Sequence, residues 1–269
     1  MLRGLILFTT LAAIFLVIGF FIGGFYGLIV AFLFAMLLNI FAYYYSDSIV
    51  LRIYGAKELK DEKIHKMVKR LAEKAGLPVP RLYVIEQQSP NAFATGRNPK
   101  HAAIAITRGL LTFDENEIEG VLAHEIAHIK NRDCLLATIA AMFATAISFL
   151  AQIGYWSMFD RERGANLIGI FLIVLFAPLA ATLIRLAISR DREYLADRTG
   201  VYITKKPHAL ASALRRIAEE VHRNPMRGST STSHLWIVNP FKSDWFTELF
   251  STHPSIEKRI ARLEEMEKK

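Results

Sequence analysis

The chain has 269 residues, of which 52% are hydrophobic, and 33 lysines and arginines against 25 aspartates and glutamates give it a net charge of +8. This composition, with a mean hydropathy of +0.26, excludes disordered, collagen-like and small disulfide-rich secreted proteins. The lone cysteine, Cys134, excludes an intrachain disulfide and a cysteine-rich zinc module. In so apolar a chain, the basic excess favours anionic lipid and cytoplasmic loops over nucleic acid as the partner.

The N-terminal part of the chain has no charged residue between positions 4 and 46. This run is about twice the roughly 20 residues that a helix needs to cross a bilayer. Gly23 and Gly24 interrupt it, so we predict two spans, at about 5–22 and 25–45, that form a transmembrane hairpin over residues 1–46. A cleaved signal peptide is the alternative, but its apolar region would be far shorter.

Residues 47–133 form the first large polar segment. Hydrophobic periodicity predicts a helix at 57–75, strands at 82–85 and 102–107, and a second helix at about 115–131. Asp114 can cap the second helix, and acidic residues follow it at the positive end of the helix dipole. This segment therefore predicts a mixed α and β structure.

Two later stretches, 134–159 and 164–184, are also uncharged and long enough to span a bilayer. They predict a second hairpin over residues 134–185 that crosses or dips into the membrane, with a buried helical hairpin as the alternative. Lysines and arginines flank the predicted spans on one side, while only Arg161 and Arg163 lie on the other. The positive-inside rule thus predicts a multi-pass protein of the cell membrane, with both termini and the polar segments in the cytoplasm.

Residues 186–269 form the second polar segment. They predict helices at about 190–199, 207–221 and 255–266, and a mobile loop rich in Ser, Thr, Asn and Pro at 224–244. The predicted fold class is a mainly α membrane protein, with two transmembrane helical hairpins and a cytoplasmic α+β domain that contains a small β-sheet. The second hairpin divides this domain into its 47–133 and 186–269 parts.

The strongest motif is HEIAH at residues 124–128. On a helix, His124 and His128 point the same way, so their imidazoles can hold one Zn²⁺. Glu125 can reach the water beside such an ion and act as a general base. The alternative is a pair of surface or capping histidines with no metal.

The third zinc ligand must come from a distant segment. A metzincin would have glycine and histidine at positions 131 and 134, where this chain has Asn131 and Cys134. We predict Glu193 as the third ligand, because the second hairpin returns the chain to the same membrane face and a carboxylate completes a His₂Glu set. Asp197, one helical turn on, can accept the second N–H of a ligand imidazole. Ordinary salt bridges with the neighbouring arginines are the alternative for both acidic residues.

The order of membrane hairpin, HEIAH, second hairpin and EYLAD (193–197) resembles the HtpX family of heat-shock integral membrane zinc metallopeptidases. The resemblance extends over nearly the whole chain and includes NAFATG at 91–96, AIAIT at 103–107 and THP at 252–254. It implies a gluzincin-like protease domain with one Zn²⁺ per chain, which hydrolyses misfolded or damaged membrane proteins. It leaves the oligomeric state open.

The resemblance also implies roles for further residues. His253 and Arg259 would approach the zinc centre and stabilise the tetrahedral oxyanion, or His253 would occupy the open zinc position. A strand edge would pair with an extended substrate through backbone hydrogen bonds. The residues expected to bind substrate in this way are Asn91, Ala103, Ile104, Ala105, Ile106 and Thr107.

Three other functions fit parts of the sequence. An intramembrane protease would bury the zinc motif within a span, but charged residues flank HEIAH on both sides. A prenyl-protein-processing membrane protease shares the zinc motifs and would cleave only prenylated peptides. A non-catalytic zinc-containing membrane adaptor would have no use for Glu125.

Overall fold

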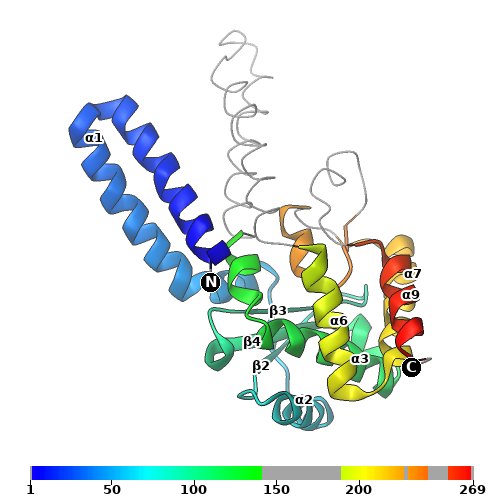
Figure 1. Cartoon of the computed structure of the whole chain (residues 1–269). Helices are drawn as coiled ribbons and strands as arrows, with labels where there is room; N and C mark the ends of the chain where they lie inside the picture. Colours follow the sequence, from blue (N-terminus) through cyan, green and yellow to red (C-terminus); the bar gives the residue numbers. More distant parts are fainter. Residues whose placement is uncertain (1, 141–188, 227–229, 242–253, 268–269) are drawn as a thin grey trace, which may run out of the picture.

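The computed structural model describes residues 2–140, 189–226, 230–241 and 254–267. Within them, a long apolar arm leads into a body of helices around a small sheet (Figure 1). The helices are α1 (Leu2–Ile53), α2 (Glu62–Ala75), α3 (Glu115–Lys130), α6 (Arg190–Thr204), α7 (Pro207–Arg223) and α9 (Ile256–Glu267). The strands are β1 (Lys57–Glu58), β2 (Arg81–Ile85), β3 (Ala92–Gly96) and β4 (Ala102–Thr107).

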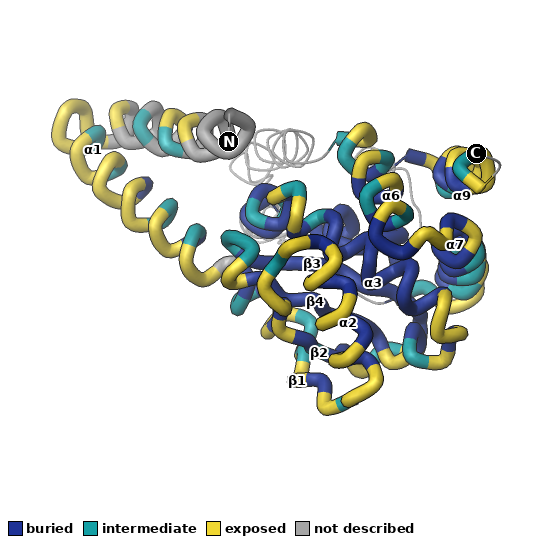
Figure 2. The backbone as a smooth tube through the Cα atoms, turned by 60° about the horizontal axis from the view of Figure 1, so that its bottom comes forward, coloured by how far each residue is buried: buried dark blue, intermediate teal, exposed yellow. Residues whose placement is uncertain are grey.

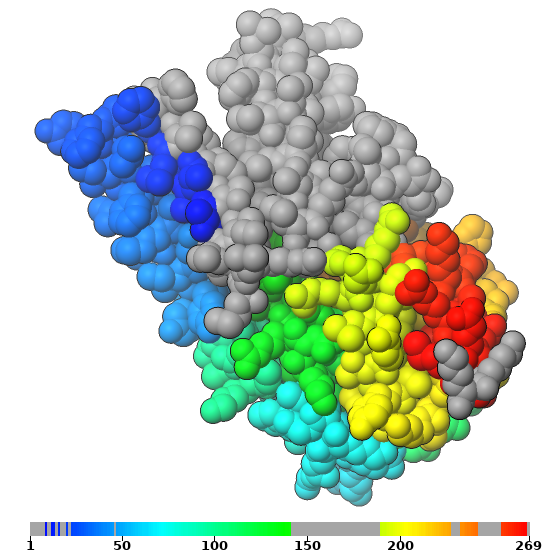
Figure 3. Space-filling model, in the orientation of Figure 1, coloured from blue at the N-terminus to red at the C-terminus, as the bar shows by residue number. Residues whose placement is uncertain are grey.

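Helix α1 is two helical segments joined at Gly23 and Gly24, whose backbone is not helical. Gly24 has φ +54° and ψ −137°, a backbone conformation that residues with a Cβ atom rarely adopt. The two helical segments fold back beside each other (Figure 1). The predicted break at this glycine pair is therefore confirmed. The segment Gly23–Tyr45 is long and apolar enough to cross a membrane, and it is the one such helix among the described residues. Figure 3 shows α1 along one side of the molecule, away from α2 and α9.

The second predicted hairpin, 134–185, lies almost entirely outside the described residues, since the description stops at residue 140 and resumes at 189. A fold with two membrane hairpins is therefore not established. What is established is a mainly helical chain with one N-terminal apolar helical arm and a small mixed sheet.

The sheet has the strand order β1-β2-β4-β3. Strand β4 pairs in parallel with β2 and antiparallel with β3, with Ile104 opposite Leu82 on one side and Ala94 on the other. All six residues of β4 are buried, which explains why its first five residues are apolar without a break. Strand β4 is therefore interior to the sheet, and β3 forms its edge.

Helix α3 occupies the middle of the body and is largely buried (Figure 2). It starts with a capping box, in which Asp114 and Glu117 satisfy each other's backbone N–H groups. It packs against α2, α6, α7 and β3. The close approach of α7 requires Gly120, where an added Cβ would lie 2.9 Å from the backbone nitrogen of Leu210.

The described part of the predicted mobile loop is packed into the body instead. Residues 232–238 are all buried, and Trp236 is fully so. The Trp236 ring lies edge-on to Phe93 at 4.9 Å and to Tyr54 at 5.0 Å, and its Nε1 donates to the Tyr54 hydroxyl. The prediction of a mobile loop is wrong for this stretch, because its aromatic and aliphatic residues outweigh its polar composition.

Candidate metal centre

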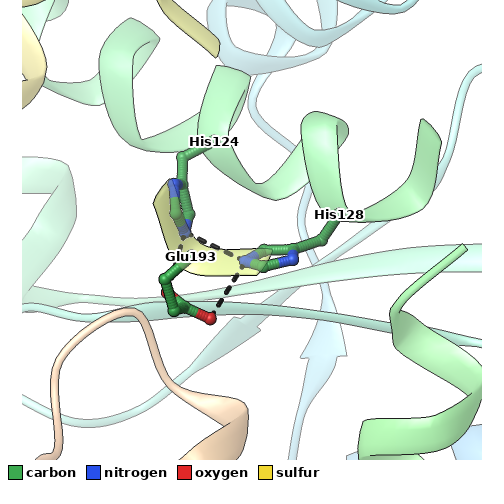
Figure 4. A group of neighbouring side chains, drawn as sticks. All are labelled: His124, His128 and Glu193. Atoms are coloured by element: carbon green, nitrogen blue, oxygen red, sulfur yellow. Dashed lines mark hydrogen bonds and ion pairs between the residues drawn. The ribbon is translucent and has the colours of Figure 1, made fainter. Parts of the chain in front are cut away.

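Helices α3 and α6 bring the three predicted metal ligands together. His124 and His128 lie one turn apart on α3, and Glu193 lies in the first turn of α6 (Figure 4). The two Nε2 atoms are 3.1 Å apart. The carboxylate oxygens of Glu193 lie 3.7 Å from His124 Nε2 and 3.6 Å from His128 Nε2.

These separations fit a zinc ion. Tetrahedral ligands at about 2.0–2.1 Å from zinc stand about 3.3 Å from one another, and the three donor atoms are close to that spacing. In the described part of the chain, this is the one group of three or more His, Cys, Asp and Glu side chains with ligand atoms so close together. The donors are two imidazoles and one carboxylate, the set that zinc takes in hydrolytic sites with one position open.

His124 is held by a buried carboxylate and a buried arginine. Its Nδ1 lies 2.9 Å from Asp197, which also accepts two hydrogen bonds from Arg259, at 2.7 and 2.9 Å. Burial, together with the Arg259 charge, lowers the pKa of His124 to about 4. The imidazole is therefore neutral at physiological pH, as a metal ligand must be.

Arg259 lies beside the metal ligands and is not among the residues that line the cavity. It is fully buried, and besides holding Asp197 it donates to the carbonyl of Ile237 at 2.9 Å. Burial alone would lower the pKa of Arg259, but the neighbouring Asp197 raises it, so the guanidinium stays charged. The structure thus places Arg259 at the metal centre, as predicted, where it supports Asp197 and lies 3.5 Å from the Glu193 carboxylate; its role toward an oxyanion stays a prediction. His253 lies outside the described residues.

His128 has a carboxylate partner that the sequence did not point to. Asp133 accepts from His128 Nδ1 at 3.1 Å, and its second oxygen forms an ion pair with Arg192. Asp133 follows the end of α3, where a charged residue is indistinguishable from an ordinary surface group. Its position five residues after a ligand histidine is the only signal in the sequence.

Glu125 lies in the cavity that the metal ligands border. The cavity is lined by Glu125, His128 and Glu193, by Ala94 of β3, and by residues 234–237. Glu125 is 2% exposed, and this burial raises its pKa to about 7. A carboxylate with a pKa near 7 can take up and release a proton at physiological pH.

The predicted substrate strand is not available for pairing. Strand β4, which contains Ala103, Ile104, Ala105, Ile106 and Thr107, has a neighbour on each side. Its backbone therefore has no free edge for an added strand, and the edge strand on this side of the sheet is β3. The cause is the non-local pairing of β4 with β2, which the sequence does not reveal.

Asn91 is also used inside the fold. Its side chain donates to the carbonyl of Val238 at 2.8 Å and accepts from the amide of Ala92 at 3.0 Å. It is fully buried, and its own amide donates to the Thr107 hydroxyl. Asn91 therefore fastens the 230–241 segment to β3, and it is not among the residues that line the cavity; its expected role in substrate binding stays a prediction.

Four consecutive residues of the 230–241 segment, 234–237, also border the cavity. His234 is buried, with Nε2 3.0 Å from the carbonyl of Ala137, and Trp236 lies two residues further along the chain. Ile237 donates its amide to the carbonyl of Ala92, on the outer side of β3. The polar composition of this stretch concealed its place at the site.

Comparison with known proteins agrees with this centre. The pattern of Peptidase family M48 matches residues 58–267. A "Protease HtpX homolog" of Pyrococcus furiosus is 52% identical over 256 residues, which cover 91% of this chain and 89% of that protein. The homologue from Aquifex aeolicus is 48% identical over 266 residues, with 94% and 88% covered.

A solved structure shares the fold. The crystal structure of S. mikatae Ste24p matches with a TM-score of 0.55 at 19% identity, over 98% of this chain and 65% of the other. The chain thus spans slightly less than two thirds of the length of Ste24p. The resemblance to the HtpX family is confirmed: the chain belongs to peptidase family M48, as a zinc metallopeptidase homologous to the HtpX proteases.

Proposed function

We propose that the chain is a membrane-integrated endopeptidase that cleaves misfolded or damaged membrane proteins at the cytoplasmic face of the cell membrane. The observation that carries the proposal is Glu125, buried in one cavity with His128 and Glu193 and bordered by the edge strand β3. A purely structural zinc site gains nothing from a general base at this position.

His124, His128 and Glu193 would hold one zinc ion per chain. When bound, the ion supplies Lewis-acid polarisation of a carbonyl and lowers the pKa of water. The carboxylate of Glu125 takes the proton from the attacking water and passes it to the leaving amine. Asp197 holds the Nδ1 proton of His124, which leaves the lone pair of Nε2 for the metal.

The substrate would bind as an added strand along β3 beyond Ala92, whose carbonyl already accepts from the amide of Ile237. Ala94 of this strand lines the cavity that contains Glu125, so a segment paired there passes beside the general base. Strand addition relies on backbone hydrogen bonds and demands little of the sequence. Such loose selectivity suits a protease that acts on unfolded segments of many proteins.

The membrane location is supported by α1. Several large hydrophobic side chains of its second half are exposed in the monomer, including Phe25, Tyr26 and Leu37. A contiguous exposed apolar surface of this kind fits the hydrocarbon of a bilayer. The distribution of lysines and arginines supports a cytoplasmic position for the termini and the protease domain, with a second hairpin at 134–185.

The test is cleavage of an unfolded membrane protein by the detergent-purified, zinc-replenished chain, beside the Glu125→Gln variant. Zinc content is measured on both. Cleavage by the parent alone, at equal zinc, supports the protease and the role of Glu125. Cleavage confined to prenylated peptides would replace the substrate class, and no cleavage of either substrate at full zinc would favour a non-catalytic adaptor.

The orientation has its own test. A cysteine introduced near Lys60, in a chain whose buried Cys134 is replaced by alanine, is exposed to a membrane-impermeant thiol reagent. We expect labelling only when the cytoplasmic face is accessible. Labelling of intact cells from outside would contradict the proposed orientation.

A further inference from the structure

We propose that Asp133, held by Arg192, is the positioning residue for the ligand His128 and joins the two zinc-binding helices. The inference rests on the proposed zinc site and adds to it two residues that act through His128 and Glu193. Both residues also line the cavity, and the effect proposed for them is on the shape and metal affinity of the site.

The hydrogen bond of Asp133 determines which nitrogen of His128 faces the other ligands. A neutral imidazole has one N–H group. In His128 this group is at Nδ1, which donates a hydrogen bond to the Asp133 carboxylate at 3.1 Å. The lone pair then lies on Nε2, the atom 3.1 Å from His124 Nε2 and 3.6 Å from Glu193. A carboxylate behind a ligand imidazole also restricts the rotation of the ring.

The end of α3 brings Asp133 back toward its own helix. Arg132 has φ +58°, in the left-handed region that non-glycine residues seldom occupy. The amides of Arg132 and Asp133 donate to the carbonyls of Ile129 and His128, which together form a Schellman motif. This turn places a carboxylate that is five residues away in sequence against the His128 ring.

Arg192 completes the arrangement from the other helix. It pairs with the second carboxylate oxygen of Asp133 and directly precedes Glu193 on α6. A cationic partner is needed because Asp133 is only 7% exposed, and an uncompensated charge there would be costly. The path from His128 through Asp133 and Arg192 to Glu193 therefore ties the end of α3 to the first turn of α6.

The two ligand histidines are supported in the same way. His124 has Asp197, which pairs with Arg259, and His128 has Asp133, which pairs with Arg192. Each carboxylate is buried and each pair joins different parts of the chain. This correspondence favours a role at the metal for the second pair over an incidental surface ion pair.

A structural role for Asp133 can be separated from the positioning role. Asp133 precedes a helical stretch at 134–140, and its carbonyl accepts from the amide of Ala137. Asparagine caps helices as well as aspartate does, so Asp133→Asn keeps a capping residue and removes the charge. Asp47→Asn is the matched control. Asp47 is 6% exposed and forms an ion pair with Arg81 at a distance of 3.0 Å, and this pair is not part of the metal centre.

The experiment measures zinc affinity of the full-length chain in detergent by competition with a chromophoric chelator. All variants carry Glu125→Gln to prevent self-cleavage. We expect Asp133→Asn and Arg192→Gln to weaken zinc binding about 10- to 100-fold, and Asp47→Asn to leave it within twofold. The visible spectrum of Co²⁺ bound in place of zinc should change in the first two variants and not in the control.

The outcomes separate this inference from the proposed function. Parent protein that binds no zinc would overturn the site itself. Parent protein that binds zinc, with Asp133→Asn and Arg192→Gln binding it equally well, would overturn only the positioning role. If Asp133→Asn fails to fold without metal, the zinc affinity of Arg192→Gln decides whether the positioning role holds. An equal loss of zinc affinity in Asp47→Asn would show that the effect is general destabilisation and would overturn the positioning role.

Discussion

Gly200 of α6 lies against the backbone of His124, so closely that an added Cβ would stand 3.2 Å from the amide nitrogen of His124. This distance is shorter than most Cβ contacts in proteins. The neighbouring atoms belong to the backbone of the buried helix α3. The absence of a side chain at Gly200 therefore sets the separation of α3 and α6. That separation in turn sets the distance from Glu193 to the two histidines.

We predict that Gly200→Ala weakens the metal site although alanine favours helices. Helix propensity alone would stabilise the variant by about 1 kcal/mol. Overpacking against α3 opposes this gain with a typical cost of about 1–3 kcal/mol. Zinc affinity and the thermal midpoint are measured beside Arg198→Ala, an exposed position on the same helix. Unchanged affinity in Gly200→Ala would show that α3 and α6 can move apart without disturbing the ligands.

A second prediction concerns Asn91, which the structure places in the fold instead of at the substrate. Asn91→Ala removes the bond to the Val238 carbonyl and leaves a buried acceptor without that donor. We expect the free energy of unfolding to fall by about 1–3 kcal/mol. The control is Asn116→Ala, whose side chain accepts from Lys206 in an exposed setting. A raised KM with unchanged stability would instead restore the role in substrate binding.

A third prediction follows from the ion pairs of Glu119. Burial alone would raise the pKa of this carboxyl, but hydrogen bonds from Lys206 at 2.7 Å and Arg70 at 2.6 Å hold it below the ordinary 4.5. Because the pKa is lower in the folded state, the stabilisation is complete well above pH 4.5 and is lost as the pH falls through the lowered value.

Glu119→Gln isolates this contribution. The difference in thermal midpoint between parent and variant should be constant at neutral pH and shrink as the solution is acidified below about pH 4.5. Glu115→Gln is the control, since the pair of Glu115 with Lys63 is more than half exposed on both sides. A difference that grows on acidification would mean that the carboxyl is stabilised in its protonated form.

How far the sequence leads depends on whether a feature is local. The spacing of His124 and His128, and of Glu193 and Asp197, is a property of one helix each, and the helical period alone placed each pair on a shared face. The helix break at Gly23 could be predicted for the same reason, because it depends on two adjacent glycines. The interior position of β4 could not be predicted in this way. It depends on parallel pairing with β2, from which β4 is separated in the sequence by β3.

Features that rely on burial were also beyond the sequence. Asp133 looks like a charge at a helix end, and only the turn at Arg132 brings it to His128. The 230–241 segment has the composition of a loop, yet Trp236 fixes it in the body beside Phe93. In both cases the deciding interaction joins residues whose approach is set by the tertiary fold.

The fourth prediction concerns the buried pair of Arg259 and Asp197. Removing the guanidinium by Arg259→Met leaves the Asp197 carboxylate buried with no cation in hydrogen-bond contact. Breaking one side of such a pair costs about 3–5 kcal/mol, so the zinc-free protein should unfold at a markedly lower temperature. Arg215→Met, whose pair with Glu264 is half exposed, should cost much less.

The double variant distinguishes a buried-charge effect from lost packing. Adding Asp197→Asn to Arg259→Met removes the uncompensated charge and should recover part of the stability. Zinc affinity should stay low in the double variant, because asparagine is a weaker acceptor for His124 Nδ1 than a carboxylate. If the double variant is instead less stable than Arg259→Met alone, then the loss comes from packing around Arg259 and not from the uncompensated buried charge on Asp197.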